Sequence, residues 1–337
     1  MHEQPVPEAF AQALRELGLA GSEPLLGEPL AGGVSSDIWR IDTAAGPICA
    51  KRALARLRVA ADWQAPITRN RYEARWYEVA AAAVPGSAPA VLGQHKALGV
   101  LAMSWLPPGE HRLWKELLRD GQADAAVARA VGDTLAKIHA WSAAHAGTLA
   151  PRFDSDAIFF DIRLEPYLLA TALRHPDLAG VLRSLVARTQ AERRALVHGD
   201  VSPKNILIDR VGRPVFLDAE CACWGDPAFD LAFCLNHLLL KCLWNAPGQA
   251  AYRQCFVALA DAYLAGVNWE PREAIEARAA ALLPGLLLAR VDGKSPVEYV
   301  TEEARRETVR RVARALLLRP VARLLPVSDA WHEELAR

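Results

Sequence analysis

The chain has 337 residues, 52% of them hydrophobic, and its 39 Lys and Arg residues are balanced by 39 Asp and Glu residues. This length is sufficient for two lobes with separate cores, and zero net charge argues against nucleic acid or an anionic membrane as the main ligand. Residues 1–10 lack the basic flank and apolar core of a signal peptide. The longest apolar run, 279–289, is too short to span a bilayer. The six cysteines lack the regular spacing of a disulfide framework, which is typical of proteins in a reducing compartment. We therefore expect a cytoplasmic protein.

The N-terminal third begins with a predicted hairpin whose turn is rich in glycine. Apolar residues at 25–30 and 38–41 predict two strands on either side of a small, flexible turn. Successive backbone N–H groups in such a turn can cover phosphate groups, although turns of this composition also occur as plain hairpin connections. The phosphate-binding interpretation rests on Gly32, Gly33 and Ser35.

The next two predicted elements carry charged residues of interest. Residues 47–51 predict a strand, and alternation places Lys51 on one of its faces, where an ordinary surface lysine is the alternative interpretation. Residues 69–83 have apolar or aromatic side chains at helical spacing, and a proline-glycine pair follows them. The segment therefore predicts a helix, whose acidic residues are Glu73 and Glu78.

A diproline followed by glycine divides the chain into two predicted lobes. Two short strand candidates precede the segment 104–109, which contains Ser104 and Leu106 and ends in Pro-Pro-Gly. Because proline and glycine stop regular structure, we predict a hinge there, with an N-terminal lobe at 1–106 and a C-terminal lobe at 107–337. Beyond the hinge, the spacing predicts helices at 124–144, 166–173, 178–196, 230–243, 249–265, 271–283 and 302–318.

Polar residues gather around a predicted hairpin near residue 210. Two short apolar strands joined by a turn-rich linker would bring Asn205, just before the first strand, near Asp218, just after the second. Mg²⁺ takes hard oxygen ligands of this kind and leaves its other positions to phosphates and water. Asp200 lies five residues before Asn205 and is then free to orient and deprotonate a hydroxyl. Phosphoryl transfer needs this arrangement.

Each of these residues also has an ordinary structural explanation. An Asp before a strand is usually a turn or cap residue, and a loop Asn usually bonds its own backbone. Their joint spacing and order favour catalysis. Cys221 and Cys223 lie next to Glu220, but a zinc site normally needs a second pair at motif spacing, so we expect buried thiols.

The segment His198-Gly199-Asp200-x4-Asn205 resembles the catalytic loop of the aminoglycoside phosphotransferase and choline kinase-like enzymes. These enzymes are small-molecule relatives of the protein kinases, whose own loop reads H-R-D-x4-N. Asp218-Ala219-Glu220 resembles the D-x-E metal motif of choline kinase and methylthioribose kinase, whereas protein kinases have D-F-G there. The resemblance runs from about residue 25 to the helices past residue 290 and is weak at both ends.

The resemblance implies an α+β, two-lobed protein-kinase-like fold, with an antiparallel sheet in the N-terminal lobe and a larger, mainly helical C-terminal lobe. It also implies an ATP-dependent phosphotransferase that moves the γ-phosphoryl group to a hydroxyl of a small molecule, with Mg²⁺ as cofactor. Asp200 would accept the hydroxyl proton, and Asn205 and Asp218 would ligate Mg²⁺. Glu220 would add to the metal site or to the acceptor site.

In the N-terminal lobe, the resemblance implies that Lys51 holds the nucleotide phosphates and forms an ion pair with Glu73. It also implies that the backbone of the hinge segment, including Ser104 and Leu106, bonds the adenine. The family counterpart of Asp230 braces the catalytic loop.

The acceptor itself stays open at this point, because such sites are built from variable C-terminal helices and the fold does not transfer the substrate. An aminoglycoside-, choline- or sugar-like acceptor would fit, and the mixed charges at 289–294 favour none of them. A nucleotide-binding regulatory module without turnover is a second interpretation. A protein kinase is a third, which Gly199 and the missing activation segment after Glu220 disfavour.

Overall fold

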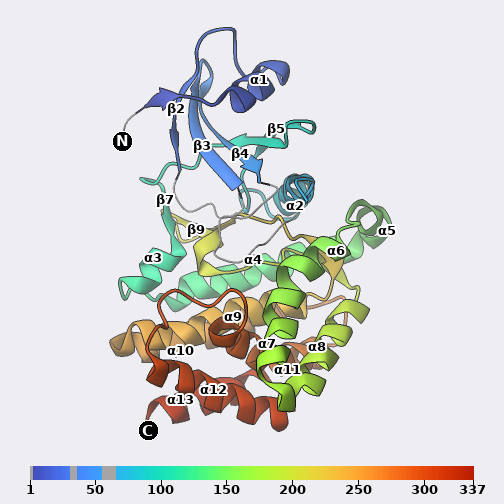
Figure 1. Cartoon of the computed structure of the whole chain (residues 1–337), viewed down its shortest axis with the longest axis vertical. Coiled ribbons are helices and arrows are strands. Elements are labelled where there is room, and N and C mark those ends of the chain that lie inside the picture. The colour runs from blue at the N-terminus through green and yellow to red at the C-terminus, as the bar shows by residue number, and fades with distance from the viewer. Residues whose placement is uncertain (1–2, 31–35, 55–65) are drawn as a thin grey trace.

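The computed structural model describes residues 3–30, 36–54 and 66–337. Its N-terminal part is an antiparallel sheet flanked by helices, and its C-terminal part is mainly helical, as predicted (Figure 1). Gly32, Gly33 and Ser35 lie outside the described residues. Every helix in these ranges falls short of the length or the apolar character that a bilayer crossing requires.

The sheet has six strands in the order β1-β2-β3-β4-β6-β5, and neighbouring strands are antiparallel. The strands are β1 Gln4–Pro5, β2 Leu26–Pro29, β3 Ser36–Thr43, β4 Gly46–Ala53, β5 Val91–His95 and β6 Val100–Ser104. Ile48 and Ala50 of β4 pack into a core with helix α1, Glu8–Glu16. Cys49 and Lys51 line a cleft on the opposite face, as strand alternation predicts.

Helix α2, Arg69–Ala83, connects this sheet to the helical part, and its bounds are the predicted ones. It packs on β4, β5 and β6 and also on α4, Ala125–Ala144. Trp76 of α2 is fully buried, with its ring centroid 4.7 Å from that of His198 and 6.0 Å from that of Phe216. The helix therefore holds the sheet against the segment that contains the predicted catalytic residues.

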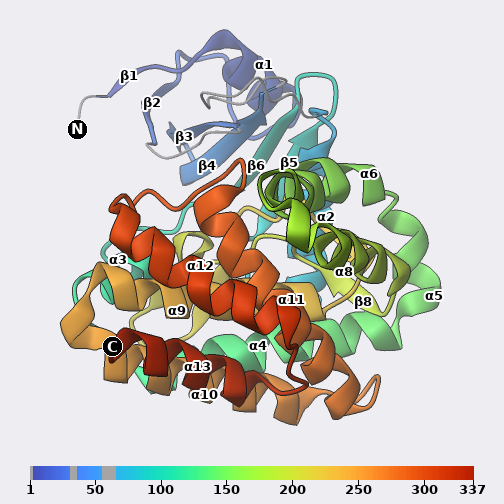
Figure 2. The same cartoon turned by 60° about the horizontal axis from the view of Figure 1, so that its bottom comes forward.

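The helical part is centred on α9, Ala228–Trp244, which is buried along almost its whole length. The other elements are α3 Trp114–Arg119, α5 Ala146–Leu149, η1 Ala150–Arg152, α6 Asp156–Phe159, α7 Ala170–Arg174, η3 Pro176–Leu178, α8 Ala179–Ala191, η5 Ala246–Gly248, α10 Gln249–Gly266, α11 Arg272–Asp292, α12 Glu303–Leu318 and α13 Leu324–Leu335. Helices α10 and α11 pack on α9, and Figure 2 shows α12 alongside α11. A Cβ on Gly132 of α4 would lie 2.3 Å from the Leu259 carbonyl oxygen, so glycine permits the close contact of α4 with α10.

Two small antiparallel sheets frame the predicted catalytic segment. Strands β9 Ile206–Asp209 and β10 Pro214–Phe216 form the expected hairpin, and β7 His111–Leu113 pairs with β9. Strands β8 Ala195–Val197 and β11 Cys223–Gly225 pair with each other. Two loops, from β8 to β9 and from β10 to β11, therefore connect the ends of paired strands and run side by side. This arrangement brings the polar residues of the two loops together.

The helix predicted over 178–196 is wrong at its C-terminal end. Helix α8 ends at Ala191, and Leu196 belongs to strand β8. A short apolar run fits either a helix or a strand. Pairing with β11, far along the chain, decides in favour of the strand.

The helix predicted over 271–283 is too short, because α11 continues through Pro284 and Gly285 to Asp292. A Cβ on Gly285 would lie 3.0 Å from the Leu185 side chain and 3.1 Å from that of Leu168. Gly285 therefore lets α11 pack closely on its neighbours. In the sequence alone, the same glycine indicates the end of a helix.

The helix predicted over 166–173 begins earlier and is irregular. The π-helical segment η2, Phe160–Leu169, precedes α7 and contains Pro166. Proline has no N–H group for a regular α-helical bond, and wider π turns accommodate such interruptions. The Pro166 carbonyl oxygen accepts a hydrogen bond from outside the segment, from the Lys294 N–H at 2.8 Å. This irregular segment carries Arg163, which reaches the site described next.

Candidate active site

The catalytic loop takes its shape from backbone bonds to helix α9. The N–H groups of His198 and Gly199 donate to the Asp230 carboxylate at 2.7 and 2.8 Å. Gly199 has φ +81°, and a Cβ there would lie 2.9 Å from the Cys221 Cβ, so the loop requires glycine at this position. Asp230 also accepts a bond from buried His139 at 3.2 Å. Asp230 therefore braces the loop, in the role that the family resemblance implies.

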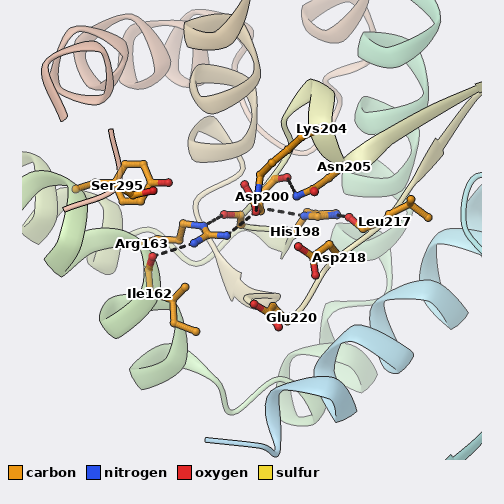
Figure 3. Close-up of polar contacts among 12 residues, drawn as sticks. Ile162, Arg163, His198, Asp200, Lys204, Asn205, Leu217, Asp218, Glu220 and Ser295 are labelled. Carbon is orange, nitrogen blue, oxygen red and sulfur yellow. Dashed lines mark hydrogen bonds and ion pairs between the residues drawn. The ribbon is translucent and has the colours of Figure 1, made fainter. Parts of the chain in front are cut away.

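The His198 ring joins the two polar segments. Its Nδ1 accepts the Asp200 N–H at 3.1 Å, and its Nε2 donates to the Leu217 carbonyl at 3.1 Å (Figure 3). Burial and the resulting loss of hydration lower the pKa of His198, although nearby carboxylates oppose this. A neutral ring with one donor and one acceptor suits both bonds.

The Asp200 carboxylate is buried and held by two cations. Arg163 Nη2 lies 2.8 Å and Lys204 Nζ 3.1 Å from its Oδ2 atom (Figure 3). Burial opposes ionisation, but Arg163 and Lys204 outweigh it and keep the pKa of Asp200 below its ordinary value. Sequence reasoning missed both cations. Lys204 could have been noticed beside Asn205, whereas Arg163 lies 37 positions before Asp200 with no local signal.

Asn205 and Asp218 face one pocket, as the hairpin prediction requires. Asn205 ends the short helical turn η4, Pro203–Asn205, and its Nδ2 donates to the Asp200 carbonyl at 3.1 Å, which leaves Oδ1 as an acceptor. Asp218 has φ +65°, an uncommon conformation for a residue with a side chain. Its N–H donates to the Tyr77 hydroxyl at 2.8 Å. Such strained backbone is typical of functional segments.

Lys51 lies among three carboxylates. Its Nζ is 2.9 Å from Glu73, contacts Asp218, and lies 3.9 Å from Glu220. Burial disfavours the ammonium charge, but Asp218 and Glu73 outweigh it and raise the pKa of Lys51 well above its ordinary value. Lys51 and Lys204 likewise outweigh the burial of Asp218 and hold the pKa of that carboxyl below its ordinary value. The ion pair between Lys51 and Glu73 is the predicted one.

Glu220 points toward Arg69, the first residue of α2, at 2.9 Å. This contact spans 151 positions, and sequence reasoning did not foresee it. Lys51 and Arg69 thus pair with three carboxylates, and the charges of Lys204 and Arg163 also act on Asp218. The oxygen donors of Asn205 and Asp218 are of the kind that a divalent cation takes.

Tyr77 of α2 is a further residue that the sequence analysis missed. Its hydroxyl donates to Glu73 at 2.7 Å and accepts the Asp218 N–H. Tyr77 thus links the helix, the Lys51–Glu73 pair and the segment that carries Asp218. Its position one turn after Glu73 on the helix was the available signal.

A cleft of about 460 Å³ between the sheet and the helical part is lined by Lys51, Glu73, Tyr77, Lys204, Asn205 and Asp218. Asp200 contacts two of these lining residues, Lys204 and Asn205. Its lining includes Met103, Ser104, Trp105 and Leu106 as well as Lys51, Asn205 and Asp218. A cleft with both apolar and charged lining residues suits a ligand with a flat ring and an anionic tail.

An antiparallel lobe over a helical lobe, with a Lys–Glu pair and paired acidic segments between them, defines a kinase-like phosphotransferase. The chain belongs to the phosphotransferase enzyme family, whose family model matches residues 27–275. A search of curated proteins gives no significant match.

Several solved structures share the fold. Spectinomycin phosphotransferase APH(9)-Ia, in complex with ADP and spectinomycin, is 10% identical with a TM-score of 0.53, covering 98% of this chain and 99% of that one. Amicoumacin kinase hAmiN, in complex with AMP-PNP, Ca²⁺ and Ami, is 13% identical with a TM-score of 0.52, covering 88% of this chain and 89% of that one. At these identities the matches show a common architecture.

Proposed function

We propose that this protein moves the γ-phosphoryl group of ATP to a hydroxyl of a small molecule. The observation that carries the proposal is buried Asp200, whose carbonyl bonds Asn205 and whose carboxylate contacts Lys204, since both of these residues line the cleft together with Asp218. A loose phosphoryl-transfer transition state requires mainly positioning and charge stabilisation, and this arrangement supplies both.

The cleft would hold the nucleotide with its base against the apolar lining residues. The backbone of the hinge segment, with Ser104 and Leu106, would bond the adenine, and Lys51, oriented by Glu73, would hold the phosphates. Gly32, Gly33 and Ser35 would cover the phosphates. In this proposal, residues 1–106 form the nucleotide-binding lobe and residues 107–337 the catalytic and acceptor-binding lobe.

Asn205 and Asp218 would hold Mg²⁺, with Glu220 as an outer member of the metal site. The ion would neutralise charge on the phosphate oxygens during transfer. The three carboxylates around Lys51 support this assignment. We also place the protein in the cytoplasm, where ATP is available and its free thiols stay reduced.

Asp200 would orient the acceptor hydroxyl and take its proton. Because Arg163 and Lys204 lower the pKa of Asp200, the carboxylate is ionised but only weakly basic at neutral pH. We therefore assign it both the orientation of the hydroxyl and the acceptance of its proton, with proton transfer late in the reaction.

ADP release across a panel of hydroxyl compounds, with ATP and Mg²⁺, tests the proposal. Asp200→Asn keeps the size and hydrogen bonding of the side chain but removes the proton acceptor. Turnover should fall about 10²- to 10⁴-fold with little change in nucleotide affinity. Turnover within about threefold of the parent would remove Asp200 from this role. Nucleotide binding without ADP release for any acceptor would favour a regulatory module instead.

A further inference from the structure

A second, smaller pocket next to the catalytic loop has four cationic side chains among its lining residues. Lys115 of α3, Lys204 of the loop, Lys241 of α9 and Arg290 of α11 face it, with Glu298 as its one carboxylate among the described lining residues. Lys115 and Lys204 also line the nucleotide cleft, so the two spaces adjoin. Lys204 itself lies 3.1 Å from Asp200. This cation pocket is therefore within reach of the proposed reaction centre.

Lys241 is the most unusual member of the cation pocket. Its side chain is 1% exposed, and no carboxylate of the described chain lies within 4.0 Å of its ammonium group. The Trp244 and Tyr299 rings contact it instead, with centroids 4.0 and 4.1 Å from Nζ. Burial, followed by the charge of Lys115, lowers the pKa of Lys241 to about 7. An amine so far from a counter-ion is stabilised by any anion that enters the pocket.

Two other buried groups of the pocket leave hydrogen-bonding atoms without partners. His237 is 5% exposed and Arg290 is 8% exposed, and neither His237 Nε2 nor Arg290 Nε has a partner in the described structure. The Tyr299 hydroxyl is also buried without a partner. Burying polar groups without partners costs free energy, and several such groups around one hollow indicate a ligand that satisfies them.

The size of the hollow limits what enters it. Its enclosed volume is about 20 Å³, which is enough for the oxygen atoms of one compact group but not for a whole acceptor. Arg290 Nη1 bonds the Tyr167 hydroxyl at 3.1 Å, and the Arg163 guanidinium lies 6.0 Å from the Tyr167 ring. Arg163 in turn holds Asp200 (Figure 3), so this contact series connects the hollow with the carboxylate that would bind the hydroxyl.

We infer that the cation pocket binds a carboxylate or phosphate group of the acceptor, so that the substrate is an anionic hydroxyl compound. The inference rests on the proposed phosphotransferase function and assigns its substrate class. Lys241 and Arg290 would neutralise the anionic group, while His237 and Tyr299 complete its hydrogen bonds. The acceptor would then extend past Lys204 and present its hydroxyl to Asp200. A cationic acceptor would instead meet repulsion from Lys241 and Arg290, which have no ion-pair partner among the described residues, whereas Lys115 pairs with Glu298 and Lys204 with Asp200.

Pairs of hydroxyl compounds that differ mainly in charge test the substrate class. We expect gluconate to release ADP with a higher kcat/KM than sorbitol, and glycerate with a higher kcat/KM than glycerol. The advantage should be about 10- to 100-fold, the effect of one or two charge-assisted hydrogen bonds. Neutral or amine acceptors that match or exceed the anionic ones would overturn the inference and leave the phosphotransferase proposal standing.

Variants at Lys241 test whether the preference for anionic acceptors arises in the cation pocket. Lys241→Met should lower kcat/KM for the anionic acceptor about 10-fold or more while the KM for ATP stays unchanged, and Lys241→Arg should keep most of the activity. Lys137→Met, at an exposed position on α4, is the matched control and should behave like the parent. A loss in Lys241→Met that appears in the KM for ATP would assign the pocket to nucleotide phosphates and overturn the inference.

A binding experiment separates the anion site from turnover. With Mg·ADP at saturation, sodium sulfate should raise the melting temperature of the parent in a saturable way, compared with sodium chloride at equal ionic strength. Lys241→Met should lose this shift, and Lys137→Met should keep it. Sulfate shifts that are equal in all three proteins would refute the site. A Lys241-dependent shift without ADP release for any acceptor would support the anion site and count against the phosphotransferase function.

Discussion

The surroundings of Lys51 show how single side chains at this site depend on one another. Its ammonium group contacts Glu73 and Asp218 at once, although each carboxylate has a different proposed task. Glu73 is fully buried and receives a second bond from Tyr77, so it orients Lys51. Asp218 is partly exposed, with 28% of its side chain accessible, so it can exchange Lys51 for a metal ion. The difference in burial is what separates the two roles.

Lys51→Ala should lower ATP affinity, because it removes phosphate contacts and leaves Glu73 buried without its cation. Glu73→Gln should have a smaller effect, since the lysine still reaches the phosphates. The two losses should be non-additive, because both act through one ion pair. Calorimetry with ATP, ADP and adenosine measures this, and the Lys51 effect should nearly vanish with adenosine. A Lys51→Ala protein that binds ATP like the parent would mean that the phosphate site lies elsewhere.

Asp218→Ala should weaken nucleotide binding mainly when Mg²⁺ is present. The expected reason is that the ion joins this carboxylate to the phosphates. Without Mg²⁺ the loss should be much smaller, since Asp218 then acts only on Lys51. Calorimetric titrations with Mg²⁺ and with a chelator compare the two conditions. Equal losses in both would assign Asp218 a folding role instead.

At the scale of elements, the catalytic loop depends on the first turn of α9. Asp230 in that turn accepts the N–H groups of His198 and Gly199 and a bond from His139, so it fixes the direction in which the loop leaves β8. Helix α2 fixes the opposite side of the site through Tyr77. Helices on two sides therefore set the distance between Asp200 and Asp218.

Asp230→Asn should reduce turnover and stability together. The amide NH₂ would face an N–H donor of the loop, which leaves a buried donor unpaired at a cost of about 1–3 kcal/mol. Nucleotide affinity should change little, because the cleft residues on the sheet are untouched. Urea unfolding and steady-state kinetics measure the two effects. Asp261→Asn, an exposed position on α10, serves as the control, and an Asp230→Asn protein as active as this control would contradict the bracing role.

At the scale of the whole molecule, the buried amine of Lys241 makes stability depend on pH. The pKa of Lys241 is lowered from its ordinary value of 10.5 to about 7, with burial as the first cause and Lys115 and Arg290 adding to it, while Glu298 opposes them. Between these values the unfolded chain binds a proton that the folded chain does not. The contribution of Lys241 therefore makes the folded state more stable as pH rises from about 7 toward 10.5.

Lys241→Met should remove this pH dependence and raise stability near pH 7, where the parent must bury a charged amine. Denaturant unfolding of both proteins at several pH values between 7 and 9.5 measures the difference, which should shrink as pH rises. Lys137→Met should follow the parent at every pH. A parallel pH dependence in Lys241→Met and the parent would show that this amine keeps its ordinary pKa.

The proximity of the proposed catalytic residues could be predicted from sequence because these residues are close along the chain. Asp200, Asn205 and Asp218 lie within 19 positions around one hairpin, and a hairpin forces nearby residues together. The bounds of α2 and the face of Lys51 follow from local periodicity in the same way. Local spacing thus determined the reaction class, and the family resemblance strengthened it.

The proposed substrate class depends only on the tertiary structure. Zero net charge and the mixed signs around residue 290 favoured no acceptor, because composition averages over the surface. Folding places Lys115, Lys241 and Arg290, from three separate helices, around one hollow, where Glu298 pairs with Lys115 and no carboxylate of the described residues pairs with Lys241 or Arg290. Arg163 reaches Asp200 through an irregular helix in the same way. Contacts between residues this far apart along the chain follow no sequence periodicity. The charge of such a cluster can therefore be known only from the packed arrangement of the helices.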